Sequence, residues 1–255
     1  MGDSKYLTLA VDIGEELLRN GAEIYRVEDS IARVLKAYEV DNYNVYVLAN
    51  GIFVSIKDED GDSLSEVRHV PLESTHLGKI VGINQLVRDI GKAKYNIDEA
   101  RQQLDKCKAI PETSLLKGLL FCAIGIGAFT YIFGGTLIDV LFGVMIGVVE
   151  QLCVGLFSRF KINKFITIIF GSMTVALLST LLVQVGVLTS SNMVVIGGIM
   201  PLLPGVAFTT SIRELYNKNY VSGLIKLADT LLSTMCIAIG IYIPIVLTHY
   251  LGGIL

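Results

Sequence analysis

Charged side chains are scarce in this sequence. Asp, Glu, Lys and Arg make up 18% of the 255 residues, whereas soluble globular proteins have roughly 25%. The mean hydropathy of +0.60 and the hydrophobic content of 52% agree with this shortage. An ordinary soluble enzyme is therefore not expected, and the apolar content excludes intrinsic disorder.

Signals of several other protein classes are also missing. No dense Lys/Arg patch occurs, so we expect no nucleic-acid partner. The four cysteines lie far apart without a Cys-x-x-Cys motif, which favours reduced, structural thiols. The first six residues lack an apolar signal core, so no targeting peptide is expected.

Motifs for metals, cofactors and catalysis are absent too. The acidic turn at residues 58–62 departs from the calcium-loop pattern and is interpreted as a solvated hairpin tip. His69 and His76 lack a third soft ligand. Gly125-Ile126-Gly127 does not complete a dinucleotide fingerprint, and no Ser, His and carboxylate set can be nominated. We therefore predict no metal, no cofactor and no enzymatic activity.

The charges that are present divide the chain in two. Residues 1–112 contain 14 Lys/Arg and 20 Asp/Glu, whereas residues 113–255 contain 7 and 4. We predict a small soluble domain over 1–112 and a membrane domain over 113–255.

Five segments of the second half are long and apolar enough to cross a bilayer, which needs about 20 residues. No charged residue occurs in the 48 positions from Phe165 to Ile212. The sequence therefore predicts an all-α membrane domain of five transmembrane helices. Their approximate bounds are Leu115–Phe133, Leu137–Phe157, Phe165–Val185, Asn192–Ile212 and Gly223–Leu251.

Lys and Arg residues occur in every second connection between these segments. They lie before the first, between the second and third, and between the fourth and fifth, whereas the other two connections carry no charge. Short basic loops stay on the cytoplasmic side. We therefore expect a multi-pass protein of the cell inner membrane, with residues 1–112 in the cytoplasm and the C-terminus outside.

Two carboxylates stand out in the second apolar segment. Asp139 and Glu150 are eleven residues apart and share a predicted helix face with Gly143 and Gly147. Because ionisable groups in a bilayer are costly, both are candidates for a substrate or proton pathway. For Asp139, a helix cap after the Gly-Gly-Thr turn is an equal alternative. For Glu150, the alternative is a structural ion pair.

The fourth apolar segment contains Pro201-Leu202-Leu203-Pro204-Gly205. Two prolines remove two backbone donors, so a break is expected there. Broken helices expose backbone groups to ligands in transporters, which makes Pro201, Pro204 and Gly205 candidate site residues. A kink that improves packing is the alternative.

In the fifth apolar segment, Lys226 and Asp229 lie three residues apart near the cytoplasmic end. Both are weaker candidates for the same pathway. Pairing with each other, or extension of their charged ends to the interface, is the favoured interpretation.

The first 112 residues change from a helical to an alternating pattern and back. Apolar residues recur at helical spacing over residues 6–20 and 24–38, with Gly21 as a stop. Strands are predicted over 43–49, 52–57 and 64–70, the last two pairing across the acidic turn. Helices over about 75–94 and 98–108 follow. This part is predicted to be a small α+β domain.

Three stretches together resemble the threonine/serine exporter family. They are Asn20-Gly21-Ala22-Glu23 running into Arg26-Val27-Glu28, then Ala49-Asn50-Gly51-Ile52, and Pro201 to Gly205 followed by Gly223 and Lys226. The chain is most similar to the larger subunit of the split, two-component form, which includes a bacterial succinate exporter.

The resemblance implies export of threonine, serine or a dicarboxylate such as succinate. It also implies a small membrane partner subunit that completes a hetero-oligomer. We interpret the chain as a secondary transporter with proton-coupled alternating access. Two alternatives stay open: a membrane-anchored cytoplasmic enzyme or regulator, and a structural subunit of a partner's channel.

Overall fold

The computed structural model describes residues 2–57, 61–71, 75–111, 114–160, 162–188 and 191–252. Residues 58–60 of the predicted acidic turn therefore lie outside the described part. The chain divides into two compact units. Unit 1 comprises Met1–Glu112 and Thr209–Lys226, and unit 2 comprises Thr113–Phe208 and Leu227–Leu255.

Unit 1 combines helices with a small antiparallel sheet, as the sequence predicts. Its first seven elements are α1 (Gly2–Arg19), α2 (Ile24–Ala37), β1 (Tyr43–Leu48), β2 (Gly51–Lys57), β3 (Ser63–His69), α3 (Leu77–Ile90) and α4 (Ile97–Lys108). Among the described residues the strand order is β1-β2-β3. The register places Tyr43 opposite Ile56 and Lys57 opposite Ser63.

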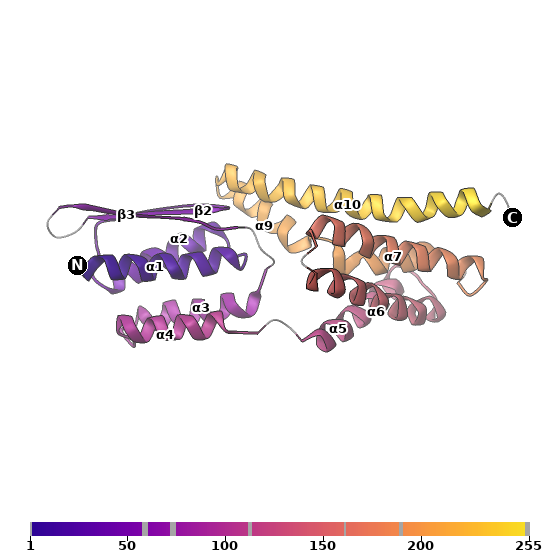
Figure 1. Ribbon diagram of the computed structural model, residues 1–255, viewed down its shortest axis with the longest axis horizontal. Helices are drawn as coiled ribbons and strands as arrows, with labels where there is room; N and C mark the ends of the chain where they lie inside the picture. Colours follow the sequence, from indigo (N-terminus) through magenta and orange to yellow (C-terminus); the bar gives the residue numbers. More distant parts are fainter. Residues whose placement is uncertain are drawn as a thin grey trace. The chain divides into compact units, whose positions relative to one another are not determined.

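Helices cover one face of this sheet. α1 contacts β2 and β3, and α2 contacts β1, an arrangement that Figure 1 shows. Along β2, Ile52, Val54 and Ile56 are buried, whereas Phe53 and Lys57 are exposed. The alternation predicted from the sequence is therefore confirmed, and it leaves the other face of the sheet open.

The turn between α1 and α2 depends on Gly21. This residue has a φ of +87°, a region that favours glycine. The amides of Gly21 and Ala22 donate to the carbonyl oxygens of Leu18 and Leu17. The predicted helix stop is confirmed, and α2 begins three residues later at Ile24.

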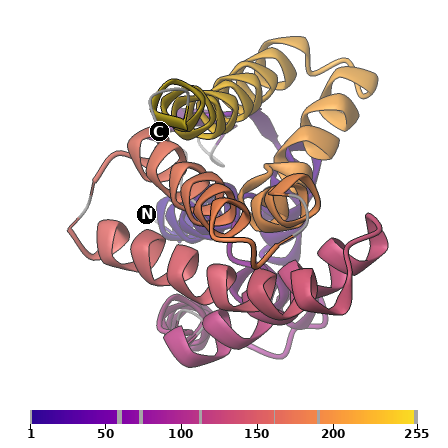
Figure 2. The ribbon, with the colours of Figure 1, turned by 90° about the vertical axis from the view of Figure 1, so that its right-hand side faces the viewer.

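Unit 2 consists of packed apolar helices. They are α5 (Leu115–Ile132), α6 (Leu137–Arg159), α7 (Lys164–Gln184), α8 (Ser191–Ile199), the short 3-10 helix η1 (Met200–Leu202), the start of α9 (Gly205–Tyr216) and most of α10 (Tyr220–Gly252). α8 contacts α5, α6 and α7. Figures 1 and 2 show α7 and α10 side by side.

Three helices of the described part are long and apolar enough to cross a membrane: Leu137–Arg159, Lys164–Gln184 and Tyr220–Thr248. The bent pair Ser191–Leu202 and Gly205–Tyr216 would make a fourth span, and Leu116–Ile132 is a shorter apolar helix. Helices thus form in all five predicted segments, but the length criterion supports three or four spans. Five spans, and the side of the membrane for each terminus, stay predictions.

Candidate functional site

The acidic residues of α6 share one buried face. Asp139 is 4% exposed and Glu150 is fully buried. Gly143 and Gly147 are buried on the same helix. A side chain at Gly147 would meet Ile126 Cδ1 at 2.5 Å, so α5 packs closely against this face. The predicted stripe of two carboxylates and two glycines is confirmed as a structural feature.

Asp139 caps α6. Its Oδ2 accepts hydrogen bonds from the backbone N–H and the hydroxyl of Thr136, both at 2.8 Å. The Thr136 hydroxyl oxygen in turn accepts from the Asp139 N–H at 3.3 Å, which completes a capping box. The capping alternative is therefore confirmed. The buried Oδ1 has no hydrogen-bond partner among the described residues.

Glu150 has a different environment. Its Oε2 accepts a weak hydrogen bond from Cys122 Sγ at 3.5 Å. Its buried Oε1 has no partner among the described residues, so no ion pair stabilises this carboxylate there. A buried charged carboxylate without an ion pair is strongly disfavoured. A proton or a cationic ligand group at this position would remove that penalty.

Thr130 is a buried polar residue that the sequence reasoning missed. It is fully buried, and its hydroxyl has no partner in the described part of the chain. A side chain at Gly197 of α8 would lie 2.3 Å from this hydroxyl oxygen, and one at Gly143 of α6 would lie 3.0 Å away. Three helices therefore meet at Thr130. The available signal for Thr130 in the sequence is that it places a hydroxyl group within an apolar segment.

The predicted break in the fourth apolar segment is confirmed. α8 ends at Ile199, η1 contains Pro201, and α9 starts at Gly205 after a bend of 58°. The Leu203 N–H donates to the carbonyls of Ile199 and Met200 at 3.2 and 3.3 Å. Pro201 and Pro204 have no N–H to donate, so the helix cannot continue regularly through them.

Lys226 and Asp229 do not form the pair that was predicted. Asp229 of α10 binds Lys164 of α7, with Oδ2 and Nζ 2.5 Å apart. Lys226 instead lies 3.3 Å from Glu214 Oε1 of α9. The pairing alternative was wrong because each side chain pairs with a residue on a different helix, which the spacing along α10 does not reveal. The other alternative, extension of the charged ends to the interface, stays a prediction.

Glu214 is the centre of a polar network in unit 1 and was missed by the sequence reasoning. It is 1% exposed. Its carboxylate accepts from the Ile24 N–H at 2.8 Å and from Asn219 Nδ2 at 3.0 Å, in addition to Lys226. Ile24 is the first residue of α2, so Glu214 caps the N-terminus of this helix. Its negative charge also interacts favourably with the positive end of the helix dipole. The adjacent charges of Arg213 and Glu214, just past the predicted end of the segment, were the available signal.

Two further contacts hold the segment Thr209–Lys226 against the rest of unit 1. Arg213 pairs with Glu23, the residue before α2. The Ser222 hydroxyl oxygen accepts from the Ala49 N–H at 3.0 Å. The motifs around Glu23 and Ala49, far apart in the sequence, therefore contact one segment, which we call the α9–α10 hairpin.

Glu28 lies beside this network. It accepts a hydrogen bond from the Val47 N–H at 3.1 Å. Burial raises the pKa of its carboxyl, the Val47 hydrogen bond lowers it, and the nearby charge of Glu214 raises it further, with a net increase. Glu28 therefore adds a protonation-sensitive group to the hairpin contact.

A comparison with models of protein families shows which family contains this chain. The model of the threonine/serine exporter family, ThrE, matches residues 8–248. The chain belongs to the threonine/serine exporter family. The match includes the α6 face, the break before α9 and the contacts of the hairpin. No curated protein and no solved structure gave a significant match.

Membership in the threonine/serine exporter family defines the general activity. The family is one of transporters, which together with the apolar helices of unit 2 indicates a membrane protein rather than an enzyme. The resemblance stated from the motifs is confirmed at the level of the family. The split form, the succinate cargo and the partner subunit stay predictions.

Proposed function

We propose that this chain is a subunit of an inner-membrane exporter that moves threonine or serine out of the cell by proton-coupled alternating access. A dicarboxylate such as succinate is the alternative cargo. A small membrane partner subunit completes the transporter. Residues 1–112 lie in the cytoplasm, five helices cross the membrane, and the C-terminus lies outside.

The observation behind this proposal is the environment of Glu150. A fully buried carboxylate in an apolar helical unit, with one oxygen lacking a partner among the described residues, favours a bound proton. Release of that proton would create a charge that a cationic ligand group or water must compensate. Protonation of the Glu150 carboxyl can therefore be linked to whether the site is open to water and cargo. Asp139 is the second candidate residue of the proton pathway.

The broken helix supplies the second part of the mechanism. We assign Pro201, Pro204 and Gly205 to the substrate pathway, where backbone groups near the break hold the cargo's carboxylate. The α9–α10 hairpin follows directly in the sequence. Contacts of Glu214, Arg213 and Ser222 hold this hairpin in unit 1, so unit 1 can restrain the helix segment that follows the break.

Transport by proteoliposomes tests the function. The chain is reconstituted alone and with its small membrane partner, and efflux of labelled threonine, serine and succinate is measured with and without a pH gradient. Efflux of threonine or serine that needs both chains and is driven by the gradient is the expected result. Succinate efflux alone would select the other cargo, and no efflux by folded, assembled protein would contradict the proposal.

Glu150→Gln separates coupling from cargo binding. We expect this variant to keep exchange of labelled for unlabelled cargo but to lose accumulation driven by the pH gradient. Asp29→Asn is the control because Asp29 is exposed on α2, where it pairs with Arg33, and is not among the candidate pathway residues. Gradient-driven efflux that survives in Glu150→Gln would remove Glu150 from the proton pathway.

A further inference from the structure

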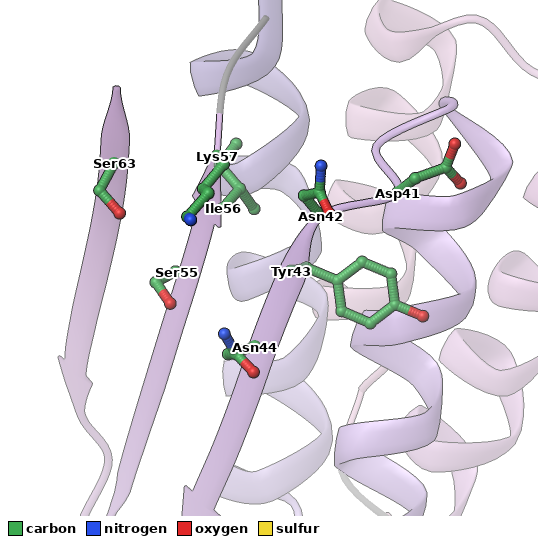
Figure 3. Close-up of a pocket in the computed structure, with 8 residues that line it drawn as sticks. All are labelled: Asp41, Asn42, Tyr43, Asn44, Ser55, Ile56, Lys57 and Ser63. Carbon is green, nitrogen blue, oxygen red and sulfur yellow. The ribbon is translucent and has the colours of Figure 1, made fainter. Parts of the chain in front are cut away.

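Exposed polar side chains line a pocket at one end of the open face of the sheet in unit 1. Figure 3 shows the Asp41 carboxylate turned away from Lys57 and Asn44. These groups therefore do not converge on one ligand. The buried polar groups of unit 2 are arranged differently, because they lie along one contact between two helices.

The helices α5 and α6 meet along a row of residues that we call the α5–α6 seam. On α5 the row contains Cys122, Ile126 and Thr130, which are four residues apart and therefore share one face of the helix. Each of them faces a different level of α6. The seam comprises the pairs Cys122–Glu150, Ile126–Gly147 and Thr130–Gly143.

Buried polar groups lie at both ends of the seam. At one end, Cys122 Sγ donates to Glu150 Oε2 at 3.5 Å, and Glu150 Oε1 has no partner among the described residues. At the other end, the buried Thr130 hydroxyl and Asp139 Oδ1 also lack partners within the described ranges. These two side chains are neighbours, because a Cβ at Gly135 would meet Thr130 Cγ2 at 2.8 Å and Asp139 Cβ at 3.3 Å. Each end therefore has one buried carboxyl group that can bind a proton.

The side chain of Ile126 occupies the middle of the seam and is fully buried. A Cβ at Gly147 would lie 2.5 Å from Ile126 Cδ1, and one at Gly143 would lie 3.7 Å from Ile126 Cγ2. Ile126 thus fills the space that the two glycines leave on α6. Cys122 and Thr130 are about 12 Å apart along the helix axis, much farther than one hydrogen bond reaches. The polar ends are therefore separated by a side chain without polar atoms.

We propose that Ile126 is an apolar barrier between two proton-binding positions, one at Glu150 and one at Asp139. A proton passes between them only when water or a polar group bridges the Ile126 side chain. Hydrophobic constrictions block conduction in channels in the same way, by excluding water. The barrier prevents the two carboxyl groups from exchanging protons without movement of cargo. The role of protons rests on the proposed function, whereas the barrier follows from the packing of the seam.

Ile126→Thr and Ile126→Val test the barrier as a matched pair. The two new side chains have the same branched shape, so both lose a similar amount of packing, and threonine alone adds a hydroxyl. We expect Ile126→Thr to leak protons, because its hydroxyl gives water a polar partner between the two ends of the seam. Ile126→Val should stay tight, because small apolar spaces remain dry.

Proton leak is measured in liposomes that contain the full chain, an entrapped pH-sensitive dye and an imposed pH gradient. No cargo is added, and potassium with valinomycin balances the charge. Ile126→Thr should collapse the gradient about tenfold faster than the native chain or Ile126→Val, the order expected from one hydrogen bond to a bridging water. Equal leak in the two variants, or no leak in either, would overturn the proposal. A second pair, Ile126→Ser and Ile126→Ala, should differ in the same direction.

A double variant tests whether the leaking protons pass along the seam. Adding Glu150→Gln to Ile126→Thr should return the leak to the native level, because glutamine cannot bind and release a proton at this position. Ile124→Thr places the same hydroxyl at an exposed position of α5 and should not leak. A leak that survives Glu150→Gln, or an equal leak from Ile124→Thr, would overturn the role of Ile126.

The leak measurement is independent of the transport test. Proton-coupled export by the native chain, without a leak in Ile126→Thr, would overturn the barrier and leave the exporter function intact. A leak in Ile126→Thr that depends on Glu150, without export of any cargo by the native chain, would support the barrier and overturn the exporter function.

Discussion

The Glu214 carboxylate receives hydrogen bonds from three parts of unit 1: the start of α2, the turn before α10, and α10 itself. Its side chain is 1% exposed and that of Lys226 is 13% exposed. Water therefore cannot replace the lost partners if the carboxylate is removed. The same atoms that cap α2 also compensate the charge of Lys226.

We expect Glu214→Ala to lower the free energy of unfolding by about 3–5 kcal/mol, because it leaves a buried ammonium group and the Ile24 N–H without this partner. Glu214→Gln should lose less, since its amide oxygen can still accept from Ile24. Asp229→Asn, at the more exposed pair with Lys164, should lose less than about 1 kcal/mol. Denaturant unfolding in detergent measures all three. Equal losses for Glu214→Ala and Asp229→Asn would contradict this account.

Glu28 provides a pH-dependent prediction. Because burial and the Glu214 charge raise its folded-state pKa, protonation of Glu28 favours the folded state. Its stabilising contribution is full below the unfolded pKa, roughly 4.3, and is lost as the pH rises through the raised folded value. Glu28→Gln keeps an acceptor for Val47 but cannot ionise.

The Glu28→Gln variant should therefore gain stability relative to the native chain as the pH rises from mildly acidic to neutral. Melting temperatures measured for both proteins over this range would show the difference. Asp29→Asn, on the exposed side of α2, is the control and should follow the native pH profile closely. A Glu28→Gln profile parallel to the native one would contradict the raised pKa.

At the scale of the helices, α7 and α10 approach each other closely at Gly240. A side chain there would lie 2.0 Å from the Ser172 hydroxyl oxygen and 2.4 Å from the Ile169 carbonyl oxygen. The second of these atoms belongs to the backbone of α7 and cannot rotate away. Any residue larger than glycine must therefore separate the two helices.

Gly240→Ala should lower the free energy of unfolding by about 1–3 kcal/mol through overpacking. Gly125→Ala is the matched control in α5, where a side chain would meet nothing within 4 Å. That substitution should be neutral or stabilise by up to about 1 kcal/mol, because alanine favours a helix. Thermal unfolding in the same detergent compares them, and a tolerated Gly240→Ala would show that α7 and α10 can repack.

Sequence patterns predicted the features that depend on neighbours along the chain. Long apolar runs indicated the helices of unit 2, the prolines at 201 and 204 indicated the break, and helical spacing placed Asp139 and Glu150 on one face. The partners of Lys226 and Asp229 could not be predicted this way. Those partners lie on other helices, and their positions depend on packing that no local pattern specifies.

The same reason explains why the hairpin contact was missed. The motifs around Glu23 and Ala49 were recognised as family features, but the α9–α10 hairpin that both contact is far away in the sequence. Ile24 and Glu214, for example, are 190 residues apart. The predicted fourth apolar segment ended at Ile212, and Glu214, two residues later, was assigned no role. Its role as a cap on α2 depends on tertiary structure alone.

At the scale of the molecule, unit 1 is assembled from two separate stretches of sequence. We expect a fragment of residues 1–112 to be less stable than a chain in which a Gly/Ser linker joins residues 209–226 to it. In the fragment, the amides of Ile24 and Ala49 lose Glu214 and Ser222 and should exchange faster. Hydrogen exchange at these two amides measures the effect, and equal protection in both proteins would contradict a stabilising role for the hairpin.

The separation between Ile24 and Glu214 also sets an order of events during synthesis. A ribosome adds roughly 5–20 residues per second, so about 10–40 s pass between the two residues, which are 190 positions apart. During this interval α2 has emerged without its cap, while the apolar segments of unit 2 are being made. Unit 1 therefore completes its folding only after most of unit 2 has been synthesised.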